Sequence, residues 1–317
     1  MALQTYPMIA WLLSSDVSIQ YETQRDLLDA PESTLKTLQK KIALEGWGAR
    51  LLSFRDRHTR LWGNGIYSPK WTSTHYTLLE LKNMGIDPAI PEYSESTEIL
   101  LHTMWHHQGK VRKTRHQDMC VTAMILDIAA YAHIQCPEIN EMVDYILEHQ
   151  YHDGGWNCAW ERGDEHSSLH TTISVLEAFR DYEKYGYSYK LPLVKKAVPK
   201  GAEFILKKHL FKAEHTGEVI NPHMITLSYP CRWHYDILRA MDYFASIKFP
   251  FDLRMSEALD IIISKRSKTG HWPVQDRYSG TTHFLMERTG GDSHWNTLRV
   301  LRVLRFYKPE MYATLLK

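Results

Sequence analysis

The sequence has few cysteines, no long apolar run and no excess of charge of either sign. Its 317 residues include 4 Cys, 38 Lys and Arg, and 37 Asp and Glu, for a net charge of +1. Four scattered cysteines are too few for a disulfide scaffold, so we expect free thiols and a cytoplasmic protein. No stretch approaches the roughly 18 apolar residues of a membrane-spanning helix, and we expect no secretory signal. The balanced charge argues against nucleic acid as a partner.

Helical periodicity dominates the sequence, and the alternating patterns typical of strands are nearly absent. We therefore predict an all-α protein that opens with two short helices, at 7–13 and 17–28. Side chains suited to metal ligation, proton transfer and cation stabilisation are abundant, with 18 His, 10 Trp and 18 Tyr. The composition predicts a functional site without identifying its chemistry.

A unit of two helices recurs five times, at intervals of roughly 50–60 residues. Each unit has an amphipathic first helix, a loop rich in Gly and Trp, and a second helix that begins with aromatic or His residues. The first helices are expected at 35–44, 96–107, 141–150, 200–210 and 256–265. The second helices are expected to begin near Trp71, Asp118, Ser168, Arg232 and Ser293.

The long loops before the second helices favour hairpins arranged in a closed ring around a cavity, because an open solenoid has short, regular loops. No linker or low-complexity segment divides the chain. We predict one α/α-toroid domain over residues 1–317. It would contain about five to six hairpins, and residues 1–30 would close or cap the ring.

One loop carries a distinctive pattern, in which Gln150 is followed by Gly154, Gly155 and Trp156. The pattern resembles the QW repeat of squalene and oxidosqualene cyclases. Adjacent glycines permit backbone conformations that other residues resist, and a buried Trp joins neighbouring hairpins, so we interpret these residues as structural. With the repeated hairpins, the chain is similar to the terpenoid cyclase and protein prenyltransferase superfamily of α/α toroids.

A second pattern resembles the metal site of protein prenyltransferase β subunits. Asp118 and Cys120 stand at the head of one expected inner helix, and His170 stands at the head of the next. The resemblance implies that these three residues hold zinc. Cys158, in the preceding loop, and His166, four residues before His170, are alternate ligands. Three protein ligands leave a fourth position open, as in catalytic zinc sites, and the metal would generate a thiolate or an activated water.

The alternative interpretation of this pattern needs no metal. Asp118 would then be a helix cap, and Cys120 would be a small buried hydrophobe.

Other candidate residues also lie around the heads of the inner helices. His75, His234 and His294 each stand four residues before the Leu that aligns their repeats, so they are expected in equivalent positions facing the cavity. With Asp236 they are candidate catalytic groups, because a His oriented by a carboxylate is a general base. The alternative is that each His only bonds a neighbouring loop. A leaving diphosphate is expected to bind Arg112, Lys113 and Arg115. Aromatic side chains expected to line an apolar pocket and stabilise positive charge are Trp71, Tyr76, Trp233, Tyr235 and Trp295. Arg299, Arg302 and Arg305 are expected to be solvated.

Together these patterns predict an enzyme of the terpenoid cyclase or prenyltransferase-like class. Zinc in the central cavity would activate a thiol or water toward an apolar, isoprenoid-type substrate. A metal-free cyclase or isomerase, with Asp118 or Asp236 as the proton donor, is one alternative. A non-catalytic toroid that binds a lipid or a partner is another. The resemblance to prenyltransferases, which are heterodimers, also leaves a second protein subunit open.

Overall fold

The computed structural model describes residues 6–106, 109–112 and 115–317, and for residues 111, 112 and 115 it describes the backbone alone. Within these residues the regular structure is almost entirely helical, which confirms the predicted all-α class. An antiparallel hairpin of β1 (Lys110–Arg112) and β2 (Arg115–His116) was not predicted. None of the described helices is long and apolar enough to cross a membrane.

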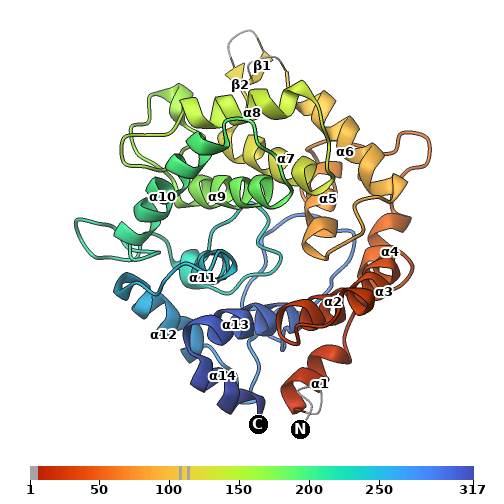
Figure 1. Cartoon of the computed structure of the whole chain (residues 1–317), viewed down its shortest axis with the longest axis vertical. Helices are drawn as coiled ribbons and strands as arrows, with labels where there is room; N and C mark the ends of the chain where they lie inside the picture. Colours follow the sequence, from red (N-terminus) through yellow and green to blue (C-terminus); the bar gives the residue numbers. More distant parts are fainter. Residues whose placement is uncertain (1–5, 107–108, 113–114) are drawn as a thin grey trace.

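The α-helices fall into an inner set, which is buried on most sides, and an outer set (Figure 1). The inner helices are α2 (Val17–Asp26), α5 (Thr74–Asn83), α7 (Met119–Tyr131), α9 (Leu169–Lys184), α11 (Ile237–Ser246) and α13 (His294–Tyr307). The outer helices are α1 (Pro7–Leu13), α3 (Glu32–Ile42), α4 (Gly46–Ser53), α6 (Pro91–Met104), α8 (Pro137–Glu148), α10 (Leu191–Lys207), α12 (Ser256–Ser264) and α14 (Pro309–Leu316). Short 3₁₀ helices lie at Trp160–Arg162, Pro222–Ile225 and Leu253–Met255.

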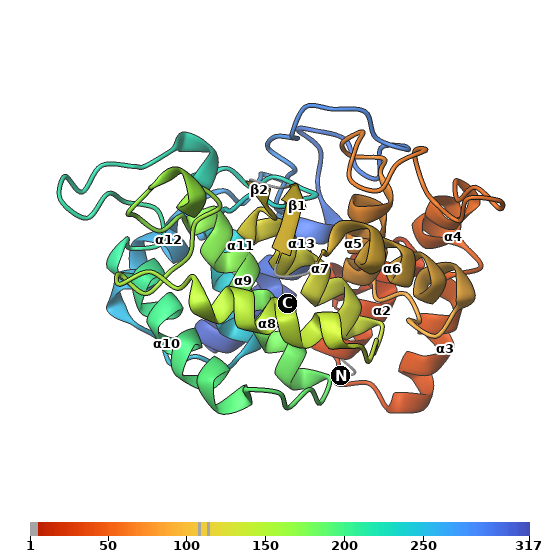
Figure 2. The ribbon, with the colours of Figure 1, turned by 90° about the horizontal axis from the view of Figure 1, so that it is seen from above.

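Several inner helices pack on the next inner helix along the chain. α5 packs on α7, α7 packs most extensively on α9, α11 packs on α13, and α13 packs on α2. Arg239 of α11 adds an ion pair with Glu177 of α9, at 2.5 Å. In Figure 1 the sequence colours accordingly pass around the molecule and return, at α13, to the side of α2. Figure 2 shows the long loops gathered on one side of the helices.

Three Trp residues of the Gly-rich loops make the same pair of hydrogen bonds. Each indole N–H donates at 2.7 Å to a carbonyl of an outer helix, in the pairs Trp62–Leu51, Trp156–Ile146 and Trp272–Ile262. Each Trp backbone N–H donates to a Thr hydroxyl of the next inner helix, in the pairs Trp62–Thr74, Trp156–Thr172 and Trp272–Thr297. All three indoles are fully buried. Each Trp therefore joins two helices of one hairpin. The first hairpin was predicted, but Trp62 and its partner helix α4 were not.

The other residues of the QW-like loop also have structural roles. Gln150 donates through Nε2 to the carbonyls of Gly154 and Ala197, at 2.8 and 2.9 Å. Gly154 has φ of 99°, a conformation that favours glycine. The Trp156 ring packs so closely on Gly201 of α10 that a Cβ there would lie 2.7 Å from it.

The second helices begin within three residues of the expected starts except at α11. Three first helices begin earlier than expected by more than that margin, α6 at Pro91, α8 at Pro137 and α10 at Leu191, and α4 and α14 were not predicted. The second helix of the fourth unit was expected to begin near Arg232, but α11 begins at Ile237. Arg232 has a left-handed φ of 55°, and Asp236 caps α11 by accepting the N–H of Arg239 at 2.7 Å. Residues 233–235 therefore form a loop, which changes where their side chains lie.

A buried lysine joins three inner helices. Lys82 of α5 lies with Nζ 2.7 Å from a carboxylate oxygen of Asp127 on α7 and 2.7 Å from one of Asp181 on α9. Burial raises the pKa of Asp127 to about 7, although the Lys82 charge opposes that shift. The three side chains are almost inaccessible to solvent, so Asp127 and Lys82 depend on this cluster for compensation of their charges, whereas Asp181 also pairs with Arg180 at 2.7 Å.

A second charged cluster joins the first and last inner helices. Arg302 of α13 lies 2.8 Å from Glu22 and 2.9 Å from Asp26, both on α2, and 2.6 Å from Asp242 on α11. Arg299 is buried, with an exposed fraction of 6%, and lies 3.4 Å from the same Asp242. The prediction that Arg299 and Arg302 are solvated is wrong, because both faces of α13 meet other helices.

The lysine cluster yields a prediction about stability. Lys82→Met leaves Asp127 and Asp181 buried without their shared cation, and we expect the free energy of unfolding to fall by about 3 kcal/mol or more. The matched control is Lys195→Met, which removes a surface ion pair with Glu183 and should cost less than about 0.5 kcal/mol. Urea unfolding followed by circular dichroism measures both values. Similar values for the two variants would contradict the proposed role of Lys82.

Candidate functional site

Four aromatic rings surround the ammonium group of Lys70. Its Nζ lies 5.2 Å from the ring centroid of Tyr67, 5.7 Å from Trp71, 6.0 Å from Tyr76 and 5.7 Å from Trp233. Each distance is within the range of a cation–π interaction. Trp71, Tyr76 and Trp233 were expected in one pocket with Tyr235 and Trp295, and the structure brings the first three together. We call Tyr67, Trp71, Tyr76 and Trp233 the aromatic cage.

The cage rings are fixed by contacts that do not involve Lys70. Trp71 donates its indole N–H to Ser279 O and its backbone N–H to Thr281 O, both at 2.8 Å. Gly280 permits this close approach, because a Cβ there would lie 2.7 Å from the Trp71 indole nitrogen. Tyr76 donates its hydroxyl to the hydroxyl of Tyr67, at 3.2 Å. The cage is thus held by residues from both halves of the chain.

Two imidazoles lie beside the cage. His234 stacks between Trp233 and Tyr278, with ring centroids 3.7 and 3.4 Å away. Its ring centroid lies 5.9 Å from that of His170, whose Nδ1 accepts the N–H of Tyr235 at 2.8 Å. Burial lowers the pKa of His234 to about 3 and that of His170 to about 4, and the nearby Arg239 charge adds to both shifts. Both rings are neutral at neutral pH.

His75 is the most deeply buried of the candidate histidines. It is fully inaccessible to solvent, next to Tyr76, and its ring centroid lies 5.3 Å from that of Tyr67. Neither ring nitrogen has a hydrogen-bond partner among the described residues. Burial, with a smaller contribution from the Lys70 charge, lowers the pKa of His75 to about 3. The ring is therefore a neutral, unsatisfied polar group beneath the cage.

Two thiols meet at the head of α7. The backbone N–H of Cys120 donates to Cys158 Sγ at 3.1 Å, and Thr171 Oγ1 lies 3.4 Å from the same sulfur. The hydrogen bond from the Cys120 thiol lowers the pKa of Cys158, and the same bond raises the pKa of Cys120. A sulfur at a helix N-terminus with hydrogen-bond donors is suited to carry negative charge. Cys158, predicted as an alternate ligand, is thus next to Cys120.

The residues expected to bind zinc are only partly brought together. Asp118 precedes α7 as its N-cap residue, two positions before Cys120, whereas His170 is turned toward Tyr235 and packs against Trp233. In the part of the chain that the structure describes, no three His, Cys, Asp or Glu side chains are grouped closely enough to hold a metal ion. The expected ligand set does not fit zinc in this arrangement, and zinc binding stays a prediction.

His166 does not share a helical face with His170. It is exposed and lies in the loop before α9, which begins at Leu169. The sequence allowed either an i, i+4 pair with His170 or a place in this loop, and the structure shows the loop.

Two other predicted residues lie away from the cage. His294 stacks on Trp11 of α1, with ring centroids 3.8 Å apart, and lies 3.3 Å from Glu287. Trp295 stacks on Tyr229, with ring centroids 5.1 Å apart. Neither residue has a ring contact with the cage among the described residues, so the expected equivalence of His75, His234 and His294 is wrong.

Tyr235 and Asp236 are buried and engaged in structural contacts. The Tyr235 hydroxyl donates to Leu210 O. Besides capping α11, Asp236 accepts a hydrogen bond from the Cys231 thiol at 3.4 Å. Because its carboxylate has these partners, it does not orient His234 as expected.

The basic residues expected to bind diphosphate cannot be placed. Lys113 lies outside the described residues, and the side chains of Arg112 and Arg115 do so as well.

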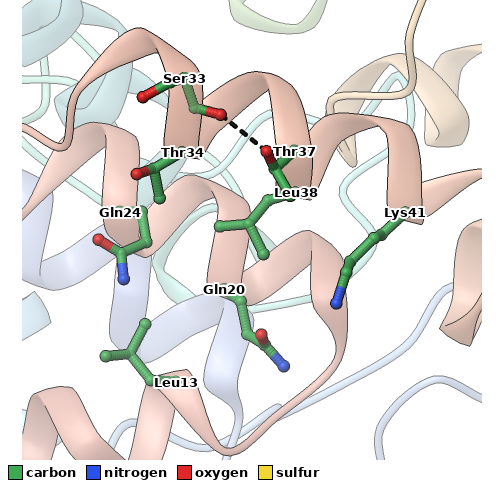
Figure 3. Close-up of a pocket in the computed structure, with 8 residues that line it drawn as sticks. All are labelled: Leu13, Gln20, Gln24, Ser33, Thr34, Thr37, Leu38 and Lys41. Carbon is green, nitrogen blue, oxygen red and sulfur yellow. Dashed lines mark hydrogen bonds between the residues drawn. The ribbon is translucent and has the colours of Figure 1, made fainter.

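A cavity of about 190 Å³ lies beside the cage and is lined by Trp71, by Tyr229 and by the segment 277–287. Arg232 and Glu80 form an ion pair at 2.5 Å in its wall, and the Arg232 guanidinium lies 4.7 Å from the Trp71 ring. A separate groove of about 460 Å³ lies between α2 and α3 (Figure 3). Gln20, Gln24 and Thr34 line that groove, which has no cluster of reactive side chains.

Sequence reasoning missed Lys70, Tyr67 and Tyr278, because they lie in loops where no periodic pattern marks them. The only available signal for Lys70 was its position in a short run of aromatic residues, between Tyr67 and Trp71.

Comparison with known proteins assigns no family, since no family model matches the chain and no curated protein matches it.

The burial of His75 predicts how stability depends on pH. Because the folded pKa of about 3 is below the ordinary value of 6.5, the unfolded chain binds a proton that the folded chain excludes between these values. The free energy of unfolding should fall as the pH is lowered through this window, by about 2 kcal/mol between pH 7 and pH 5.

This contribution can be isolated with His75→Gln. Urea unfolding at the two pH values should show a fall about 2 kcal/mol smaller in this variant than in the parent. His152→Gln, at an exposed position, should retain the parental pH dependence. An unchanged pH dependence in His75→Gln would show that His75 is not held neutral.

Elemental analysis tests the zinc prediction. The chain would be purified without a tag and incubated with zinc under reducing conditions. The resemblance predicts about one zinc per chain, lost in Cys120→Ala and in His170→Ala but kept in the control Cys136→Ala. A parent protein that retains no zinc would exclude the site.

Proposed function

We propose that the helices form a closed α/α toroid whose reactive site lies at the heads of the inner helices. The contact between α13 and α2, reinforced by the ion pairs of Arg302, supports closure of the ring. The repeated Trp contacts of Trp62, Trp156 and Trp272 support a ring built from equivalent hairpins. The residues around the site come from the heads of α5, α7 and α9 and from the loop before α11.

We propose further that the chain is an enzyme of the terpenoid cyclase or prenyltransferase-like class. The observation that carries this proposal is the convergence of four aromatic rings on one cationic position, at Lys70 Nζ. Ring faces stabilise a positive charge without attacking it, whereas a carboxylate would combine with a carbocation. Such a site suits an apolar substrate that develops positive charge on carbon during the reaction.

The side chains around the cage fit this chemistry. His170 and His234 are neutral, so they add no positive charge that would oppose a cationic intermediate. Trp233 and His234 are half-buried, which gives an apolar substrate both contact area and access. The sulfur of Cys158, with its lowered pKa, is a candidate acceptor for a proton or an electrophile. None of these roles depends on zinc.

The proposal is tested by incubating the whole chain with farnesyl diphosphate, with and without a thiol peptide, and with squalene. We expect an isoprenoid product by mass spectrometry. A product with the mass of squalene but a different chromatographic retention time would indicate cyclisation or isomerisation. Addition of the isoprenoid group to the peptide would indicate transfer.

Substitution of one cage ring should weaken this activity. We expect Trp233→Leu to lower kcat/KM about tenfold, because a cation–π contact contributes roughly 1–2 kcal/mol. The matched control is Trp160→Leu, since Trp160 is also half-buried but packs on His149 outside the cage. Equal activity of the two variants would contradict the proposed role of the cage, and failure of all substrates to react would contradict the proposed class.

A further inference from the structure

The ammonium of Lys70 lies in the cage, and no polar side chain or backbone group that the structure describes is paired with it. Among the described residues, none accepts a hydrogen bond from Lys70 Nζ or forms an ion pair with it, and its contacts there are with the four rings. Lys70 itself is exposed, so its long side chain can leave the cage for water without disturbing the fold. The cage rings keep their own contacts through Ser279, Thr281 and the Tyr67–Tyr76 hydroxyl pair.

We propose that Lys70 holds the place of a ligand cation, and that the cage binds a small compound with a methylated, quaternary ammonium group. The inference rests on the proposed function only in placing the ligand at the same rings as the substrate. In the absence of ligand, the Lys70 ammonium stands in for the trimethylammonium group.

The spacing of the cage favours a methylated cation over a bare ammonium. Lys70 Nζ lies 5.2–6.0 Å from the ring centroids, in the outer part of the range of roughly 6 Å for a cation–π contact. A methyl group on the nitrogen would extend toward a ring by about 1.5 Å. A methylated cation at this position would therefore bring its positively polarised methyl groups closer to the ring faces than the bare nitrogen is.

The polarity of the site favours the same ligand. A primary ammonium has three N–H donors that only water can satisfy here, because the four cage rings offer them aromatic faces. A quaternary ammonium has no donor to leave unsatisfied, and aromatic cages are a general means of binding such groups. The neighbouring His75 and His234 rings are neutral at neutral pH and do not repel it.

Direct binding to the whole chain tests the proposal without turnover. Choline would be titrated calorimetrically and compared with 3,3-dimethyl-1-butanol, which has the same shape but no charge. We expect choline to bind and the neutral alcohol to bind at least tenfold more weakly. Lys70→Ala should bind choline several-fold more tightly than the parent, because no side chain must be displaced.

Variants of the cage separate binding from folding. Trp233→Leu should lose at least tenfold in choline affinity, Trp233→Phe should retain most of it, and Trp160→Leu should match the parent. Equal binding of choline and the neutral alcohol would overturn the proposal, as would absence of choline binding to Lys70→Ala. Capture by phosphatidylcholine vesicles without binding of free choline would also overturn it, because the ligand would then be a lipid surface.

These outcomes are independent of the reaction. Choline binding without conversion of any isoprenoid would support the cage as a cation site and contradict the proposed enzyme class. Isoprenoid conversion without choline binding would support the proposed enzyme class and contradict the cage as a cation site.

Discussion

The guanidinium of Arg302 lies among carboxylates from two other inner helices, and the arrangement of the site depends on this contact. Glu22 and Asp26 belong to α2, and Asp242 belongs to α11. Such a cluster contributes little net stability compared with apolar packing, but it is costly to leave incomplete. It therefore selects one position of α13 between α2 and α11. The segment that leads into α13 is placed at the same time, and it carries Ser279 and Thr281, which hold Trp71.

The local parts of the fold were predictable because they follow from patterns within one hairpin. The all-α class and most inner-helix starts came from periodicity, and the role of Trp156 came from its Gly-rich loop. The buried charges were not predictable in this way. Arg299 and Arg302 have the spacing of a solvated stripe, and only the approach of α2 and α11 buries them. A single sequence contains no signal of which helix will cover a charged face.

The candidate site was also predictable only where its residues are close together in the sequence. Alignment of the repeats gave His75, His234 and His294 the same place, but they occupy different positions relative to their helices. His75 is in the first turn of α5, His294 begins α13, and His234 precedes α11 in a loop caused by the left-handed Arg232. Their side chains therefore point to different surroundings. Lys70 was missed because the rings around it come from residues 67–76 and from Trp233, which only the folded chain brings together.

The contact between Arg302 and Glu22 also determines the order in which the helices can finish packing during synthesis. These residues are 280 positions apart, so at about 5–20 residues per second a ribosome needs roughly 15–60 seconds to pass from one to the other. During that time the hairpins around α7 and α9, whose contacts are local, can already pack. The acidic face of α2 has no Arg302 to cover it until these 280 positions have been translated. The first inner helix is thus the last of the six to be fully enclosed, and the nascent chain carries an unpaired acidic edge throughout that interval.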